Sequence, residues 1–438
     1  MDNAHSKYLS AKRPAVFYGW VVIGIGFITL GVIFGLWYSF SVFFLVIIQE
    51  FGWGRGIGAS IFSIFLISHA LTGLLSGYLQ DRFGPRVVMP IGAVILALSL
   101  IVTSQSMRLW QFYLIYGVLA GASVGLLGFT SHAAFLPNWF ERKRGLAVGI
   151  AMAGIGFGML ILVPLVERSI ASFGWRATYL LLAGLVLFII GPLNLIFSRR
   201  RPEDLHLRPD GDLSGQNRSP ARRSMVMKIV DPEWAENDWT LAKASRTRRF
   251  WLLLGAFFCL SYSYQGTLLH AISAMVDYGL ARDRGAFYFG LLGIAGSAGK
   301  VLFGYLSDRF GRERSNTLGA ITAALGILCL ICSAWILGPL PLFFALFFGL
   351  GYGAAAPLLP SIGADIFIGR SFGLIFAVIG IGGGAGGALG SFLSGVLRDT
   401  TGTYFIPLII CAVSLMLSCA LIWATSPRKI RRMVRIQA

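Results

Sequence analysis

The feature that most constrains this chain is a series of long apolar runs, because each is long enough to cross a membrane. A hydrocarbon core of about 30 Å takes about 20 residues of helix to cross. Backbone amides find no water there, so each crossing has to be helical. The sequence therefore predicts an all-α membrane protein. Its twelve predicted spans are 18–46, 57–78, 87–105, 109–135, 145–168, 177–198, 249–275, 285–306, 315–335, 339–362, 371–396 and 403–425.

The composition agrees with a bundle of membrane helices. Charged residues make up only 13% of the 438 residues, too few to cover a soluble protein. The 55 glycines suit helices that approach closely in lipid. We find no nucleophile triad, no phosphate-binding loop and no metal-ligand spacing in the sequence. We therefore expect a protein that is not an enzyme and that uses no cofactor or metal.

The positions of Lys and Arg predict the orientation in the membrane. With the N-terminus inside, the inner segments hold 29 of the 37 basic residues, the outer loops hold seven, and Lys300 lies within a span. Inner loops are enriched in basic residues in membrane proteins. We therefore expect a multi-pass protein of the cell membrane with both termini in the cytoplasm. The net charge of +18 then reflects contact with anionic lipids, and nucleic acid is not expected as a partner.

One long polar segment divides the spans six and six. The predicted domains are residues 1–198, a cytoplasmic central loop of residues 199–248, and residues 249–438. The later part of this loop contains Trp234, Trp239 and Leu241. Two interpretations stay open for it: an amphipathic helix lying at the membrane surface, or a solvated linker.

The two halves of the chain repeat one another. A shift of 227 residues, without a gap, aligns 51–84 with 278–311, and 14 of the 34 positions are identical. Such a match indicates that six spans were duplicated, as in secondary transporters built from parallel repeats. We expect two similar bundles that meet at a central cleft and expose it to alternate sides by rocking.

The most strongly repeated stretch follows the second span of each half. It reads Gly-Tyr-Leu-Gln-Asp-Arg-Phe-Gly-Pro-Arg at 77–86 and Gly-Tyr-Leu-Ser-Asp-Arg-Phe-Gly-Arg at 304–312. Both copies resemble the signature of the major facilitator superfamily. The resemblance implies twelve transmembrane helices in two pseudo-symmetric six-helix bundles. We expect Asp81 to meet a helix N-terminus or an arginine and hold one face closed. The predicted gating residues are Gly77, Asp81, Arg82, Gly84, Arg86, Asp308, Arg309, Gly311 and Arg312.

Two further motifs resemble the monocarboxylate porter and oxalate–formate exchanger branch of that superfamily. The first span opens Phe-Tyr-Gly-Trp-Val-Val at 17–22, although the acidic residue usual before the Gly is missing. Residues 139–154 read Trp-Phe-Glu-Arg-Lys-Arg-Gly-Leu-Ala-Val-Gly-Ile-Ala-Met-Ala-Gly, close to the pattern of that branch. The resemblance implies transport of small organic anions by proton symport or anion exchange.

Lys300 is the candidate that carries most weight. A charge near the middle of the bilayer costs roughly 2.5–3.5 kcal/mol or more, so it indicates a functional site. Its repeat equivalent is Gly73, so the fold does not need a base there. In the resembling branch, an arginine at this place is taken to hold the substrate carboxylate. The alternative is a lysine that snorkels to the membrane surface.

The surroundings of Lys300 favour an anion with one charge. The acidic companion that the branch carries one turn earlier is Gly296 here, and span 371–396 lacks the second base of the exchangers. Other candidates lie mainly in spans that line the cleft in this superfamily. The predicted substrate-binding residues are Lys300, Tyr38, Tyr116, Tyr264, Gln265, His270 and Tyr352, and the proton-coupling candidates are His69, His270 and Lys300.

Together these features predict a secondary active transporter of a small organic anion, with a monocarboxylate as the leading substrate. We expect it to function as a monomer in contact with membrane lipids, with protons as a candidate coupled ion. Two alternatives stay open. One is an efflux carrier for amphipathic compounds, and the other is a transport-inactive sensor that signals through the central loop.

Overall fold

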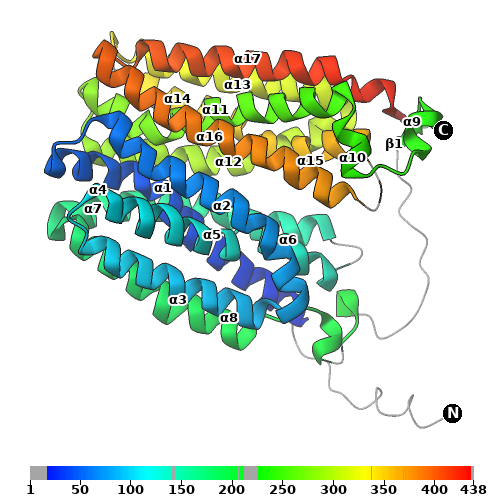
Figure 1. Cartoon of the computed structure of the whole chain (residues 1–438), viewed down its shortest axis with the longest axis horizontal. Helices are drawn as coiled ribbons and strands as arrows, with labels where there is room; N and C mark the ends of the chain where they lie inside the picture. Colours follow the sequence, from blue (N-terminus) through cyan, green and yellow to red (C-terminus); the bar gives the residue numbers. More distant parts are fainter. Residues whose placement is uncertain are drawn as a thin grey trace.

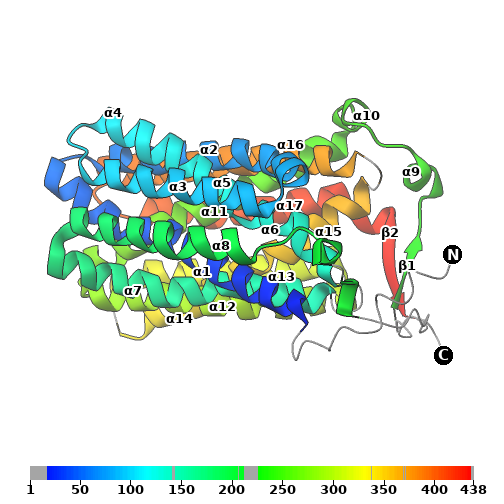
Figure 2. The same cartoon turned by 90° about the horizontal axis from the view of Figure 1, so that it is seen from below.

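The protein is a bundle of long, nearly parallel helices (Figures 1 and 2). The computed structural model describes residues 17–140, 144–205, 207–211, 225–336, 338–367, 369 and 371–435. In Figure 1 the helices of the C-terminal half lie above those of the N-terminal half. We call the end of the bundle that holds Tyr18 and Arg431 the proximal end, and the opposite end the distal end.

The N-terminal half is built from helices before the central loop. They are α1 (Tyr18–Phe51), α2 (Arg55–Phe83), α3 (Pro85–Ser104), α4 (Leu109–Gln111), α5 (Gly121–Leu127), α6 (Phe129–Phe135), α7 (Arg144–Leu185) and α8 (Gly191–Phe197). Two π-helical stretches, Phe112–Ala120 and Val186–Ile190, continue α4 into α5 and α7 into α8, and a 3-10 turn, Leu136–Trp139, follows α6.

The C-terminal half is built from helices after the central loop. They are α11 (Arg248–Asp277), α12 (Arg282–Phe310), α13 (Arg312–Cys332), α14 (Leu340–Gly353), α15 (Ala355–Ile366), α16 (Phe372–Thr401) and α17 (Phe405–Thr425), followed by the 3-10 turn Pro427–Lys429. Helix α11 begins with a regular cap, since the Thr247 side chain accepts a hydrogen bond from the backbone N–H of Phe250.

Eleven helices among the described residues are long and apolar enough to cross a membrane, against twelve predicted spans. The difference lies in one helical run of 53 residues, Gly145–Phe197, which covers two predicted spans. At 1.5 Å per residue it would measure about 80 Å if straight, far more than a bilayer needs. It is broken at Gly174, whose φ of 79° is strained for residues with a Cβ. The run therefore folds back and crosses twice.

The backbone repeats between the halves as the sequence does. Helix α12 begins and ends 227 residues after α2, so both helices have 29 residues. The turns that follow them place Gly84 and Gly311 at φ of 75° and 92°. The prediction of an all-α membrane protein in two pseudo-symmetric bundles is confirmed for the membrane-spanning part of the chain.

The central loop differs from both interpretations of its later part. It forms two short helices, α9 (Pro232–Glu236) and α10 (Leu241–Ser245), in place of one amphipathic helix. Trp234 packs against Trp239 with ring centroids 4.4 Å apart, and its Nε1 donates to the carbonyl oxygen of Ile366 at 2.8 Å. These residues therefore pack on the C-terminal half and are not a solvated linker.

A small sheet is an element that the sequence pattern did not predict. Strand β1 (Met225–Ile229) in the central loop pairs antiparallel with β2 (Arg431–Arg435) near the C-terminus. The guanidinium of Arg431 is buried and donates to the carbonyl oxygens of Ala364 and Asp365. The C-terminal segment is thereby attached to the proximal end of its own half.

Close helix packing in the N-terminal half depends on glycine. Helix α1 lies so near α7 that a methyl group on Gly158 would overlap the carbonyl oxygen of Gly31, and one on Gly154 would overlap that of Phe27. In lipid there is no hydrophobic drive between helices, so such contacts supply much of their attraction. Gly24, on the same helix α1, has open space around it and faces outward.

We expect Gly158→Ala to destabilise the protein by about 1–3 kcal/mol, because α1 and α7 have to move apart. The matched control is Gly24→Ala, which gains helix propensity of up to about 1 kcal/mol and meets no neighbour. Thermal unfolding of the purified protein in detergent measures both. Equal unfolding temperatures for the two variants would contradict this account of the α1–α7 contact.

Candidate functional site

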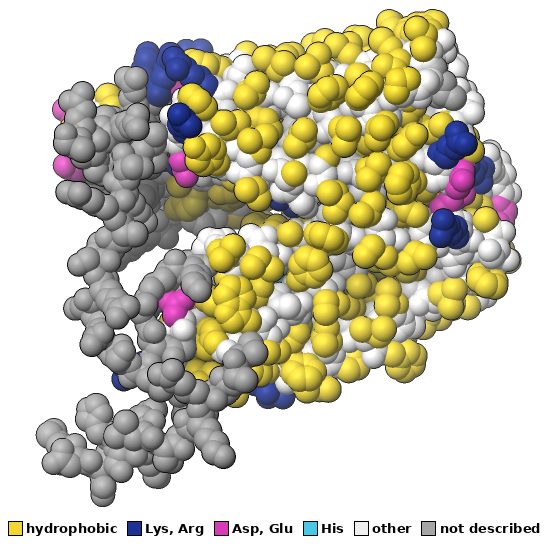
Figure 3. All heavy atoms as spheres, turned by 180° about the vertical axis from the view of Figure 1, so that it is seen from behind, with side chains coloured by type: hydrophobic (Ala, Val, Ile, Leu, Met, Phe, Trp, Pro, Cys, Tyr) yellow, Lys and Arg dark blue, Asp and Glu magenta, His cyan; other side chains and the backbone are white. Residues whose placement is uncertain are grey.

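The two halves meet along the distal part of the bundle and part toward the proximal end. Figure 3 shows a hollow between them at the proximal end, on the left of the view, whereas basic and acidic side chains gather at the distal end. The described structure is therefore closed distally, and its cleft opens proximally.

We use the term distal closure for the polar contacts that join the halves, made by Arg55, Gly56, Asp277 and Asp399. The guanidinium of Arg55 pairs with Asp277 at 2.7 Å. The carboxylate of Asp399 accepts the backbone N–H groups of Arg55 and Gly56 at 2.9 and 2.8 Å. An acidic side chain of one half thus caps the N-terminus of α2 in the other, where the helix dipole favours negative charge.

The distal closure was not predicted, although the sequence holds a signal for it. Arg55 and Arg282 are identical residues at equivalent positions of the repeat. Arg282 also reaches the other half, where it donates to Oε1 of Gln49 at 2.6 Å. The acidic partners Asp277 and Asp399 carry no comparable signal, since their importance depends on the distant segments that they touch.

Lys300 lies on the side of α12 that faces the cleft. On this helix Phe289, Gly296 and Lys300 follow one another at spacings of seven and four residues, so they share a face. Phe289 contacts the ring of Tyr38, and Gly296 lies against Tyr352. Val301 and Tyr305, which are 75% and 60% exposed, mark the lipid-facing side of the helix. The ammonium group makes no hydrogen bond or ion pair within the described part of the chain.

Three of the predicted tyrosines lie together beside this face. The hydroxyls of Tyr38 on α1 and Tyr352 on α14 are 2.6 Å apart, which joins the two halves by a hydrogen bond. Tyr264 packs edge-on against Tyr352, with ring centroids 5.0 Å apart, and donates to the carbonyl oxygen of Gly351. Lys300 is one helical turn from Gly296, the residue that Tyr352 touches.

His270 is placed at a different depth from Lys300. It lies seven residues from the distal end of α11, and Lys300 lies 18 residues from the distal end of α12. At 1.5 Å per residue the two are about 16 Å apart along the bundle axis. His270 Nε2 lies 2.9 Å from the carbonyl oxygen of Ser391, so it donates there. Its Nδ1 lies 3.2 Å from the hydroxyl of Tyr404, to which Arg55 also donates. His270 therefore borders the distal closure.

Tyr116 lies away from the cleft. Its ring stacks on Phe40 and Phe65 at 4.7 and 5.4 Å, inside the N-terminal half. His69 and Gln265 are only partly buried, and one side-chain atom of each, Nδ1 and Oε1, is buried without a hydrogen-bond partner. The structure thus groups Lys300 with the tyrosines and separates it from His270 and Tyr116.

The first copy of the loop motif is joined to the central loop. Asp81, with 72% of its side chain exposed, lies 3.7 Å from Arg200, which belongs to the same half and not to the opposite bundle. Arg82 donates to the hydroxyl of Tyr78, and Arg86 donates to the carbonyl oxygen of Leu195. A methyl group added at Gly77 would meet no neighbour within 4 Å, so this part of α2 borders open space.

The second copy forms a tighter network. Arg312 pairs with Asp308 at 3.0 Å and with the buried Asp365 at 3.3 Å, and Arg309 donates to the hydroxyl of Tyr305. All these residues belong to the C-terminal half. In this conformation neither copy of the motif forms an ion pair between the halves within the described residues.

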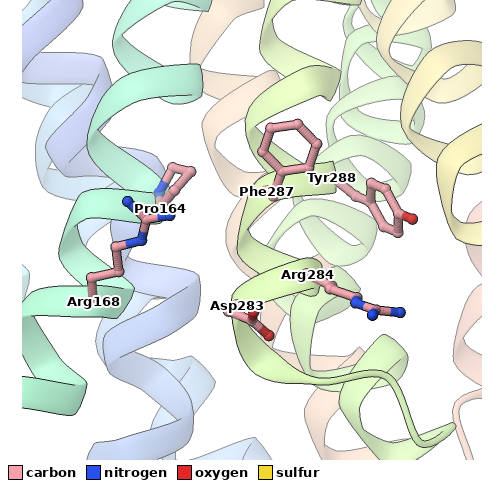
Figure 4. Close-up of a pocket in the computed structure, with 6 residues that line it drawn as sticks. All are labelled: Pro164, Arg168, Asp283, Arg284, Phe287 and Tyr288. Carbon is pink, nitrogen blue, oxygen red and sulfur yellow. The ribbon is translucent and has the colours of Figure 1, made fainter.

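The largest cavity lies elsewhere. It occupies about 370 Å³ at the distal end, between α7 and α12, and Figure 4 shows its lining. Arg168 and Pro164 come from α7, and Asp283, Arg284, Phe287 and Tyr288 come from α12. It contains none of the predicted substrate-binding residues.

Comparisons with known proteins agree with this architecture. A family model described as Major Facilitator Superfamily matches residues 25–387. Monocarboxylate transporter 12 of Xenopus laevis is 27% identical over 416 residues, covering 92% of this chain and 88% of the relative. An uncharacterized MFS-type transporter of Bacillus subtilis (strain 168), YcxA, is 28% identical over 397 residues, covering 87% and 89%.

A solved structure shares the fold. It is a bacterial homologue of the human lysosomal transporter Spinster in an inward-facing and occupied conformation. Its TM-score is 0.69 at 14% identity, and the match covers 95% of this chain and 98% of that one. With a family model that spans most of its length, this chain belongs to the major facilitator superfamily of membrane transporters and resembles the monocarboxylate transporters among them.

Proposed function

We propose that this chain is a secondary active transporter that carries a small organic anion, a monocarboxylate, through the cleft by alternating access. The observation that carries the proposal is the ammonium of Lys300, which faces the cleft and has no partner in the described part of the chain. The relatives named monocarboxylate transporters support this substrate class.

The charge balance of the site favours a monoanion. A carboxylate bound to Lys300 forms a charge-assisted hydrogen bond, worth about 1.5–3 kcal/mol. One ammonium neutralises one carboxylate, whereas a second negative charge would stay unpaired in a medium of low dielectric constant. The hydroxyls of Tyr38 and Tyr352 lie near the same face and offer further hydrogen bonds to a small anion.

The seams between the halves support alternating access. Gly156 of α7 meets Ser297 of α12 in the packed distal part. Because these helices are antiparallel, seven residues further toward the proximal end Gly149 would face Gly304. Neither of these glycines touches the opposite half in this structure. The proximal part of this seam is thus open but built for close packing.

The seam between α2 and α16 has the same construction. Leu66 contacts the position of Gly387 in the packed part, and seven residues further Gly73 would face Gly380. Again neither glycine touches the opposite half. We propose that rocking closes both pairs of glycines at the proximal end while the distal closure opens.

The orientation of the protein follows from the same proposal. The basic residues of the proximal segments predict that this end is cytoplasmic. The described conformation would then be the one open to the cytoplasm, in the cell membrane. Binding of the anion beside Tyr38 and Tyr352, one from each half, links occupancy to closure. Coupling is by proton symport or by anion exchange.

We expect Lys300→Ala to lower the uptake of small monocarboxylates into proteoliposomes by about tenfold to a hundredfold, because a charge-assisted hydrogen bond is lost. Lys300→Arg keeps the charge and should retain part of the uptake. Lys243→Ala, in the central loop, is the matched control and should transport as the wild type does. Uptake by Lys300→Ala at the wild-type rate would remove Lys300 from the mechanism. Simultaneous recording of proton entry separates symport from exchange.

We expect Gly149→Leu to bind substrate but not to transport it. The larger side chain has room in the described conformation, yet it would prevent α7 from reaching α12 at the proximal end. Gly184→Leu, on the same helix and with equally open surroundings, is the control. Substrate binding is measured by thermal shift, and transport by counterflow in proteoliposomes. Normal counterflow by Gly149→Leu would show that this seam does not close.

A further inference from the structure

The repeat places one polar residue in each half, on equivalent faces of α2 and α12. The face of α12 carries Phe289, Gly296 and Lys300, and the equivalent positions of α2 carry Phe62, His69 and Gly73. Each half therefore has a polar side chain where the other half has glycine. His69 lies one helical turn, about 6 Å, further toward the distal end than the position equivalent to Lys300.

His69 and Trp37 have polar atoms that the protein does not satisfy. Their rings meet edge to face, with centroids 4.7 Å apart. Nδ1 of His69 and Nε1 of Trp37 are both buried and have no hydrogen-bond partner. Trp37 is 5% exposed. Buried polar atoms without a partner are rare in proteins and indicate that something absent from the structure supplies one.

The position of this pair is on the cleft side of α2. Ile67 and Leu71, which are 45% and 51% exposed, mark the lipid-facing side of that helix, and His69 lies on the other side. Trp37 and His69 each lie 14 residues from the distal ends of α1 and α2, at about 21 Å. Tyr38, which bonds to Tyr352 across the cleft, is the neighbour of Trp37 in the chain.

We infer that Trp37 and His69 form a second substrate subsite, which binds an uncharged hydrogen-bonding group remote from the carboxylate that Lys300 holds. This inference rests on the proposed function. The indole N–H only donates, and a neutral imidazole offers one donor and one acceptor, so a hydroxyl, carbonyl or amide group is suited to the pair. A charged group is disfavoured, since no described side chain supplies a counter-charge to His69.

The spacing of the two subsites sets the kind of substrate. Lys300 and His69 belong to opposite halves and differ by about 6 Å in depth. A group on the carbon next to the carboxylate would stay beside Lys300, so the second polar group has to be several bonds away. The substrate is therefore a short-chain monocarboxylate with a neutral polar group at its far end. It would bridge the two halves, which makes its binding favour closure.

The test compares two acids that differ only at this far end. Butyrate and butyrate with a hydroxyl on its terminal carbon are assayed as substrates in proteoliposomes. Each neutral hydrogen bond is worth about twofold to tenfold in affinity, so the wild type should prefer the hydroxylated acid by about that factor or more in kcat/KM. His69→Phe and Trp37→Phe keep the aromatic packing but remove the polar atoms. Each should lower this preference by about twofold to tenfold while butyrate uptake changes less than about twofold.

Two further variants separate binding from folding. His69→Asn keeps a donor and an acceptor and should retain part of the preference. Tyr179→Phe removes a buried, unpartnered hydroxyl from the aromatic core of the N-terminal half and is the matched control. Its preference should equal that of the wild type, and thermal unfolding verifies that all variants fold.

The possible failures have different meanings. A wild type that transports both acids equally, or variants that lose both acids to the same extent, would overturn the subsite and leave the proposed function standing. A wild type that transports neither acid, together with no effect of Lys300→Ala on any carboxylate tested, would overturn the proposed function and this inference with it.

Discussion

Lipid surroundings leave helices as the means of satisfying the backbone, so the packing of helix against helix sets the rest of this structure. Where that packing is closest it depends on glycine, as between Gly158 and Gly31 within the N-terminal half. The same kind of contact joins the halves distally, where Gly156 lies on Ser297. Where the glycines of opposite halves stand apart, the cleft is open. The conformation can thus be read from which glycines are in contact.

The cleft that this packing creates holds few polar groups, and they differ in kind. Lys300 provides one positive charge, Tyr38 and Tyr352 provide hydroxyls that meet between the halves, and His69 and Trp37 provide neutral groups without partners. In a medium of low dielectric constant each of them interacts strongly with whatever enters. This small set accounts for both parts of the proposal: one negative charge, and a neutral polar group at some distance from it.

Features that depend on local pattern and on the repeat could be predicted from the sequence. The apolar runs predicted the spans, and only the joining of two of them across Gly174 changed their count. The cost of burying a charge singled out Lys300. What could not be predicted was the rotation of each helix about its axis, which places Tyr116 in an aromatic core, and the depth of His270 relative to Lys300. Trp37 escaped notice because an indole in an apolar run resembles any packing residue. Asp277 and Asp399 matter only through segments far away in the chain.

The hydrogen bonds around Tyr404 have a consequence for spectroscopy. Arg55 of one half donates to the phenol oxygen that His270 of the other half contacts. Separation of the distal ends would withdraw that guanidinium and leave the imidazole with an altered set of neighbours. The ring nitrogens of His270 would then report, by their chemical shifts, whether the far mouth of the protein is shut, without any label placed at the surface.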